Sequence, residues 1–171
     1  GIAWGALVDY WFLTGNDKWS GLVSQGMLAQ VRPNYDYSPP GIGGTEVRLA
    51  AMSATELTFI NHPSYLPQWI DLAHNVFSYQ TWRWDDQSRG GGLHQQLDPS
   101  AQGYSYKSTT AAANFFLLSS RLAQYMKNGT YQTWAVKQYQ WMNAIRLTDF
   151  NHHIFDGPDS AASCSQIINL A

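Results

Sequence analysis

Six segments with the apolar period of an α-helix, arranged in three pairs, constrain the fold of this chain more than any other feature. In each segment apolar side chains recur every three or four residues, which places them on one face of a helix. The clearest stripe consists of Trp69, Leu72, Ala73, Val76, Phe77 and Gln80. The pattern predicts an all-α fold with helices over residues 3–11, 19–30, 47–57, 67–80, 112–126 and 131–142.

The connections between these helices alternate in length. Short turns at 14–17 and 128–130 join helices within a pair, whereas segments 34–44 and 90–107 are long and rich in turn-forming residues. Short connections join antiparallel neighbours, so we expect three helical hairpins. Long loops between hairpins are typical of an α/α toroid that gathers its loops at one rim, although an ordinary six-helix bundle has the same periodicity.

Length and charge narrow the class of protein. The chain has 171 residues, of which 44% are hydrophobic, so we expect residues 1–171 to form a single helical unit around one core. A formal net charge of -2 argues against nucleic acid as a partner, and no apolar run reaches the roughly 18 residues of a membrane span. Eight Trp and ten Tyr favour a neutral saccharide, because aromatic rings stack on sugar C–H faces, although such rings also fill cores.

Eight short strings occur along the chain in a fixed order. They are Asp9-Tyr10-Trp11 with Thr14-Gly15-Asn16, Leu28-Ala29-Gln30, Ala50-Ala51-Met52-Ser53-Ala54-Thr55-Glu56, Arg83-Trp84-Asp85, Gly90-Gly91-Gly92-Leu93, Gly103-Tyr104-Ser105-Tyr106-Lys107, Ser120-Arg121-Leu122-Ala123 and Phe155-Asp156-Gly157. Together they resemble glycoside hydrolase family 76. The resemblance implies an (α/α)6 barrel, hydrolysis or transfer at α-1,6-mannan without a cofactor, and a secreted or cell-wall location.

The resemblance also locates the family's catalytic motif, which this chain lacks. The family carries Asn-Asp-Asp-Gln ahead of its Ala-Ala-Met helix, and the adjacent aspartates serve as nucleophile and acid/base. Counting back without a gap from Ala50 places at these positions Gly41, Ile42, Gly43 and Gly44, with Glu46 the only acid nearby. Because a retaining glycosidase needs two carboxyl groups about 5–5.5 Å apart, we assign no catalytic pair at this position.

A second Asp-Asp-Gln string, Asp85-Asp86-Gln87, copies the missing motif. Asp85 matches the family's Arg-Trp-Asp string, so a polar helix end beside a glycine loop is favoured over a relocated catalytic pair. By the resemblance, the residues expected to bind substrate are Arg83, Trp84, Asp85, His94, Gln96, Tyr104, Tyr106 and Lys107. Arg89 replaces the cysteine that usually precedes the triple glycine, which leaves Cys164 without an implied partner.

Three further features complete the predicted surface. The pattern of His94, His152 and His153 matches no metal-ligand spacing, so we expect solvent-facing side chains and no metal. The sequon Asn128-Gly129-Thr130 marks Asn128 as an N-glycan acceptor in a secreted protein.

Six helices are about half of the family barrel, and half a toroid exposes apolar flanks. We therefore expect the chain to be a piece of a larger toroid, or a second protein chain to complete it.

Three hypotheses for the function follow. The first is a family 76-like enzyme that acts on α-1,6-mannan, with a relocated acid pair as one form of this hypothesis. The second is a mannan-binding pseudoenzyme, which the missing aspartates favour. The third is a helical scaffold or partner subunit that retains the fold for protein contacts. Cleavage of mannan would indicate the first hypothesis, and binding without cleavage would indicate the second. Neither binding nor cleavage would favour the third.

Overall fold

The computed structural model describes residues 2–29, 31–36, 68–151 and 153–157. Five α-helices lie in these ranges, namely α1 (Ile2–Thr14), α2 (Ser20–Leu28), α4 (Trp69–Trp82), α5 (Thr109–Met126) and α6 (Gly129–Ala144). A short 3-10 helix, η1 (Pro33–Tyr35), follows α2. The described residues form no strand beyond two isolated β-bridges, so the all-α prediction is confirmed. The helix predicted over 47–57 falls outside the described residues.

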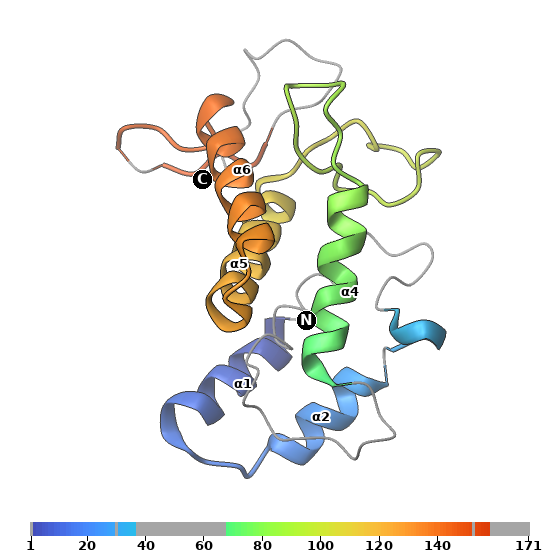
Figure 1. Ribbon diagram of the computed structural model, residues 1–171, viewed down its shortest axis with the longest axis vertical. Coiled ribbons are helices and arrows are strands. Elements are labelled where there is room, and N and C mark those ends of the chain that lie inside the picture. The colour runs from blue at the N-terminus through green and yellow to red at the C-terminus, as the bar shows by residue number, and fades with distance from the viewer. Residues whose placement is uncertain (1, 30, 37–67, 152, 158–171) are drawn as a thin grey trace.

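Two of the predicted hairpins are present. Figure 1 shows α5 and α6 side by side along most of their length, with α1 and α2 forming a second pair at the other end of α4. Lys127 ends α5 in the left-handed conformation, with φ of 52°. Asn128 then caps α6 by accepting a hydrogen bond from the backbone N–H of Thr130 at 2.9 Å. A two-residue turn therefore reverses the chain.

The apolar stripe of α4 forms the centre of the core. All six residues predicted on this face are buried. The Phe77 ring contacts Phe115 of α5 and Tyr131 of α6, with ring centroids 5.8 and 4.7 Å apart. Val8 and Val23 extend the same cluster to α1 and α2. This cluster packs α4 against the other four described α-helices.

Several apolar residues of α1 and α2 are exposed. Tyr10, Trp19 and Leu22 are exposed, with fractional exposures of 40, 42 and 52%. The core here is contacted by Val8 and Val23, both fully buried. A helical apolar stripe is more than about 100° wide, so residues at its edges stay accessible when only its centre contacts the core.

The long connections meet at one end of the helices. Segment 83–108 leaves α4 and enters α5, and the segment after α6 returns to the same end in Figure 1. The Thr109 hydroxyl donates a hydrogen bond to the carbonyl of Phe155, which ties the two segments together. For these two connections, the predicted gathering of loops at one rim is confirmed. Among the described helices, none has the length and apolarity needed to cross a membrane.

Candidate functional site at the loop end of the helices

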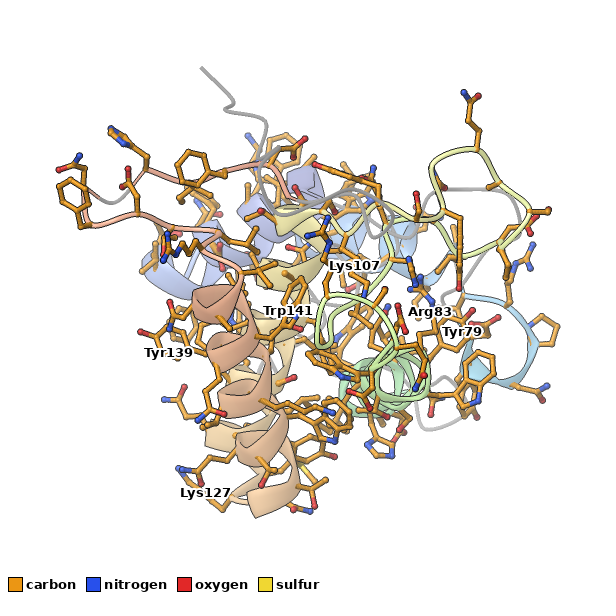
Figure 2. All side chains as sticks on the ribbon, turned by 90° about the horizontal axis from the view of Figure 1, so that it is seen from above. Tyr79, Arg83, Lys107, Lys127, Tyr139 and Trp141 are labelled. Carbon is orange, nitrogen blue, oxygen red and sulfur yellow. The ribbon has the colours of Figure 1, made fainter. Side chains whose placement is uncertain are left out.

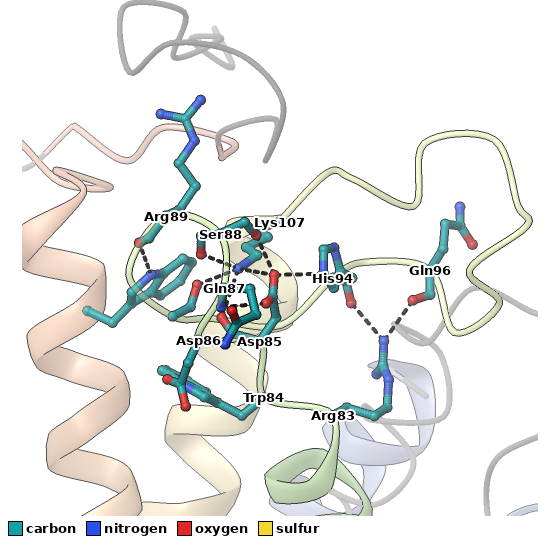
Figure 3. A network of polar contacts seen from close by, with 12 residues as sticks. Arg83, Trp84, Asp85, Asp86, Gln87, Ser88, Arg89, His94, Gln96 and Lys107 are labelled. Carbon is teal, nitrogen blue, oxygen red and sulfur yellow. Dashed lines mark hydrogen bonds and ion pairs between the residues drawn. The ribbon is translucent and has the colours of Figure 1, made fainter.

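Asp85, three residues beyond α4, is the centre of a polar network (Figure 3). Its Oδ2 atom lies 2.9 Å from Nζ of Lys107 and 3.0 Å from Nε2 of His94, and it also accepts from the Ser88 hydroxyl. Because an ionised carboxylate only accepts hydrogen bonds, His94 must donate through Nε2. Oδ1 accepts from the backbone N–H of Gln87 at 2.8 Å. Both carboxylate oxygens are therefore occupied by groups of the protein.

Lys107 is the second charged residue of this network. Its side chain is fully buried, and Nζ also donates to the carbonyls of Ser88, Gly91 and Asp85 at 2.7, 2.6 and 3.2 Å. Burial lowers the pKa of Lys107, although the Asp85 carboxylate opposes this shift. The ammonium group thus fixes the course of the backbone through the glycine loop.

The same contacts determine the charge of Asp85. Burial alone would raise the pKa of Asp85. Hydrogen bonds from Ser88, Lys107 and the Gln87 backbone, together with the Lys107 charge, outweigh burial and hold the pKa of this carboxyl well below its usual range. Asp85 is therefore ionised at neutral pH and has no proton to donate.

The triple glycine is required by two indole rings. Gly91 and Gly92 have φ of 136° and 100°, a region that side chains with a Cβ rarely adopt. A Cβ on Gly91 would overlap the Trp84 ring, and one on Gly92 would overlap Trp141. Trp141 of α6 also donates through Nε1 to the carbonyl of Arg89 at 3.0 Å. The glycines let the loop backbone lie directly against α6.

Arg83, at the end of α4, secures the other side of the loop. It donates to Oε1 of Gln80 at 3.0 Å and to the carbonyls of His94 and Gln96 at 2.9 and 2.7 Å. Its guanidinium carbon lies 5.7 Å from the centroid of the Tyr79 ring. Figure 2 shows Tyr79 and Arg83 next to each other on α4. Arg83 therefore connects the α4 surface to segment 94–96.

A cleft of about 530 Å³ opens between the end of α4 and this loop. The His94 and Tyr104 rings stack in it, with centroids 4.3 Å apart and planes 16° from parallel. The cleft is lined by Tyr79, Trp82, Arg83, Trp84, Asp85, His94, Leu97, Pro99 and Tyr104. Its volume is within the range of roughly 300–1,000 Å³ typical of small-ligand sites. The cleft combines ring faces with one cation and one anion.

The structure brings most of the predicted substrate-binding residues together. Arg83, Trp84, Asp85, His94 and Tyr104 all line the cleft. The Gln96 carbonyl is bound by Arg83, and the Tyr106 carbonyl accepts from the backbone N–H of Gln95 at 2.8 Å. Burial and the nearby Asp156 carboxylate raise the pKa of Tyr106. Lys107 is placed beneath the cleft, where it positions other groups.

One prediction about histidine is wrong. His94 was expected to face solvent, but it is 8% exposed because Asp85 binds one edge of its ring and Tyr104 stacks on a face. His153 is exposed as expected, and His152 falls outside the described residues. Within the described ranges, no three His, Cys, Asp or Glu side chains form a group that could hold a metal ion.

Four cleft residues were not identified from the sequence, namely Tyr79, Trp82, Leu97 and Pro99. Tyr79 and Trp82 are three residues apart on α4 and off its buried stripe, a spacing that brings two side chains together on the helix surface. This spacing of two aromatic residues was a usable signal. Nothing in the sequence of segment 97–99 points to the cleft.

Asp86 does not form an acid pair with Asp85. Its side chain is 64% exposed, and Oδ1 accepts from Trp84 Nε1 at 2.6 Å and lies 3.5 Å from Nζ of Lys137. In Figure 3 the Asp86 side chain extends toward Trp84, away from the cluster around the Asp85 carboxylate. The two aspartates are adjacent in the sequence, but their carboxylates have different partners and different environments.

Comparisons with known proteins identify the family. The mannan endo-1,6-alpha-mannosidases DCW1 and DFG5 of Saccharomyces cerevisiae are 36% and 31% identical over 98% and 99% of this chain. The chain spans 39% of the length of each. Dfg5 from Chaetomium thermophilum, solved with glucosamine, is 39% identical and superposes with a TM-score of 0.89 over 97% of this chain and 43% of its own.

A more distant structure shows the same fold. The alpha-1,6-mannanase GH76A of Salegentibacter sp., solved as an inactive variant with alpha-1,6-mannotriose, is 18% identical and has a TM-score of 0.73. The alignment covers 99% of this chain and 48% of that one, so the chain corresponds to about half of an (α/α)6 barrel. The model of glycosyl hydrolase family 76 matches residues 1–171. The chain therefore belongs to glycosyl hydrolase family 76.

Proposed function

We propose that this protein binds α-1,6-linked mannan in the cleft at its loop end, without the aspartate pair that the family uses for hydrolysis. The cleft itself is the observation that carries the proposal, since it offers the stacked rings of His94 and Tyr104 beside a balanced pair of charges. A neutral polyol suits such a lining better than an anion does, because the charges of Arg83 and Asp85 balance and leave no excess positive charge. The names of the relatives supply the saccharide class.

The residues divide into two roles in this proposal. Asp85, Lys107 and Arg83 act as positioning residues, because their polar atoms bind other parts of the loop. Tyr104 and the exposed Trp82 ring contact the glycan. Positioning by a buried ionic cluster keeps the cleft formed before the ligand arrives, which reduces the entropy lost on binding.

The geometry at Asp85 supports binding over turnover by a relocated acid pair. An acid/base residue must carry a transferable proton, whereas the pKa of Asp85 is strongly lowered. A nucleophile must approach the anomeric carbon, whereas protein donors occupy both Asp85 oxygens. Endo-mannosidase activity is the second candidate, which the names of the relatives favour.

The proposed ligand also suggests where the protein acts. Mannan recognition would be useful at a cell surface or wall, as the family resemblance implies, and the exposed sequon residue Asn128 fits a secreted protein. The expected pairing with a second chain stays a prediction, as does a larger toroid around residues 1–171. A role as a helical scaffold has no specific support among the described contacts.

The decisive experiment incubates the purified protein with α-1,6-mannotetraose. Binding is measured by titration calorimetry and products by chromatography, with an α-1,4-glucan tetramer as the control saccharide. We expect binding without cleavage, and we expect Tyr104→Ala to weaken it while Tyr139→Ala, an exposed tyrosine on α6, does not. Cleavage would establish the second candidate, and the absence of both binding and cleavage would refute mannan recognition.

A further inference from the structure

The last turn of α4 carries an exposed aromatic pair that the polar network does not use. Trp82 is 79% exposed. Its ring stacks on Tyr79, with centroids 5.8 Å apart and planes 26° from parallel. Offset stacking of this kind restrains both rings in one orientation. The pair therefore presents a flat, preorganised apolar surface to solvent.

The position of this pair distinguishes it from other exposed apolar residues. Phe12, Leu13 and Phe150 are also exposed, but they are not part of the cleft lining. Among the described residues, Trp82 is the one large hydrophobic side chain that is both exposed and part of this cleft. Trp82 therefore places an accessible ring face at the rim of the cleft, beside Arg83.

The second ring of the pair links this surface to the interior of the cleft. Tyr79 packs under the Arg83 guanidinium, and Arg83 donates to the backbone of His94, which stacks on Tyr104. The Tyr79–Trp82 pair and the His94–Tyr104 pair are therefore both linked to the Arg83 guanidinium. Three hydrogen bonds, to Gln80, His94 and Gln96, hold the Arg83 guanidinium in place in the cleft lining.

We propose that Tyr79 and Trp82 form a saccharide-stacking subsite at the rim of the cleft, which takes one neutral hexose unit of a mannan chain whose neighbouring unit lies between Arg83 and Tyr104. This inference rests on the proposed mannan recognition and extends it to a named subsite. The apolar C–H face of the hexose covers the Trp82 indole, while its hydroxyls point to solvent and to the guanidinium.

The test compares two exposed tryptophans. Trp82→Ala removes the subsite, and Trp82→Phe keeps a ring at the same place. Trp19→Ala is the matched control, because Trp19 is 42% exposed and precedes α2, away from the cleft lining. Each variant is titrated with α-1,6-mannotetraose and with the disaccharide α-1,6-mannobiose, and circular dichroism verifies its helical content.

We expect Trp82→Ala to weaken tetrasaccharide binding about tenfold, or by about 1.4 kcal/mol, because Trp and Tyr are enriched among the residues whose truncation costs most in affinity. Trp82→Phe should recover most of that loss, and Trp19→Ala should bind as the wild type does. A Kd for Trp82→Ala within twofold of wild type would overturn the subsite and leave mannan recognition intact. A wild-type protein that binds no mannotetraose would overturn both.

Discussion

Replacing Lys107 by Met tests whether the buried ionic cluster determines the structure of the loop end. Methionine keeps the volume of the side chain but removes a charge that is fully buried and 2.9 Å from the Asp85 carboxylate. Removing one partner of a buried ion pair costs about 3–5 kcal/mol, because the other charge remains buried without its partner. For a chain of this size we expect the midpoint of thermal unfolding to fall by roughly 6–20 °C.

The assay is thermal and denaturant unfolding in a double-mutant cycle with Asp85→Asn. Neutralising Asp85 removes the charge that Lys107→Met leaves behind, so the double variant should lose about 0.5–3 kcal/mol less than the sum of the single variants. Lys137→Met is the control, because that lysine forms a half-exposed ion pair at 3.5 Å and should cost less than about 1 kcal/mol. Equal effects of the two lysine variants, or an additive cycle, would refute the reasoning.

Four further predictions follow from the same geometry. The pKa of Asp85 is lower in the folded state than in the unfolded chain, so its stabilising contribution is present above about pH 4 and is lost below it. The difference in free energy of unfolding between wild type and Asp85→Asn should therefore stay constant near neutral pH and narrow on acidification below about pH 4, and a difference that does not narrow there would contradict this. Gly92→Ala should destabilise the protein by more than about 1 kcal/mol in thermal unfolding, because φ is positive and an indole fills the space; unchanged stability would show that the loop can move. On expression in a secretory eukaryotic host, Asn128 should carry an N-glycan, since the helix cap uses its Oδ1 and not Nδ2, and Thr130→Ala should remove the added mass. Asp86→Asn should leave mannan binding and any turnover unchanged in the calorimetric and chromatographic assays, and a loss of turnover would revive the relocated pair.

The helical part of the fold was predictable because burial on a helix follows a period that the sequence displays. Each residue of the stripe from Trp69 to Gln80 is buried as predicted. The capping turn at Asn128 was predictable for the same local reason, since its signal lies within three residues. The period alone could not show which apolar residues stay exposed. On α1, Val8 is fully buried in the core, whereas Tyr10 is 40% exposed.

The site was predictable as a set of residues but not as a set of roles. A lysine is rarely fully buried, so nothing in the sequence marks Lys107 as the centre of a cluster. Its partner Asp85 lies 22 residues away, and the two meet only because the intervening loop folds back. His94 is buried for the same reason. Contacts made across an irregular loop leave no periodic pattern in the sequence.

Four of the eight strings that this chain shares with its family, at residues 83–85, 90–93, 103–107 and 155–157, meet at one place in the structure. Asp85 and Lys107 form the ion pair, the Gly91 carbonyl accepts from Lys107, and a Cβ on Gly157 would overlap the Lys107 backbone. These shared residues therefore form a framework that keeps the cleft open. The same framework contacts are needed whether a bound glycan is cleaved or only held. The first requirement of a family member is a formed cleft, which the shared strings predict. The second requirement, which applies only to catalysis, is two carboxyl groups on either side of the glycosidic bond. Protein donors bind both oxygens of Asp85, and we propose on this ground that Asp85 serves the first requirement and not the second.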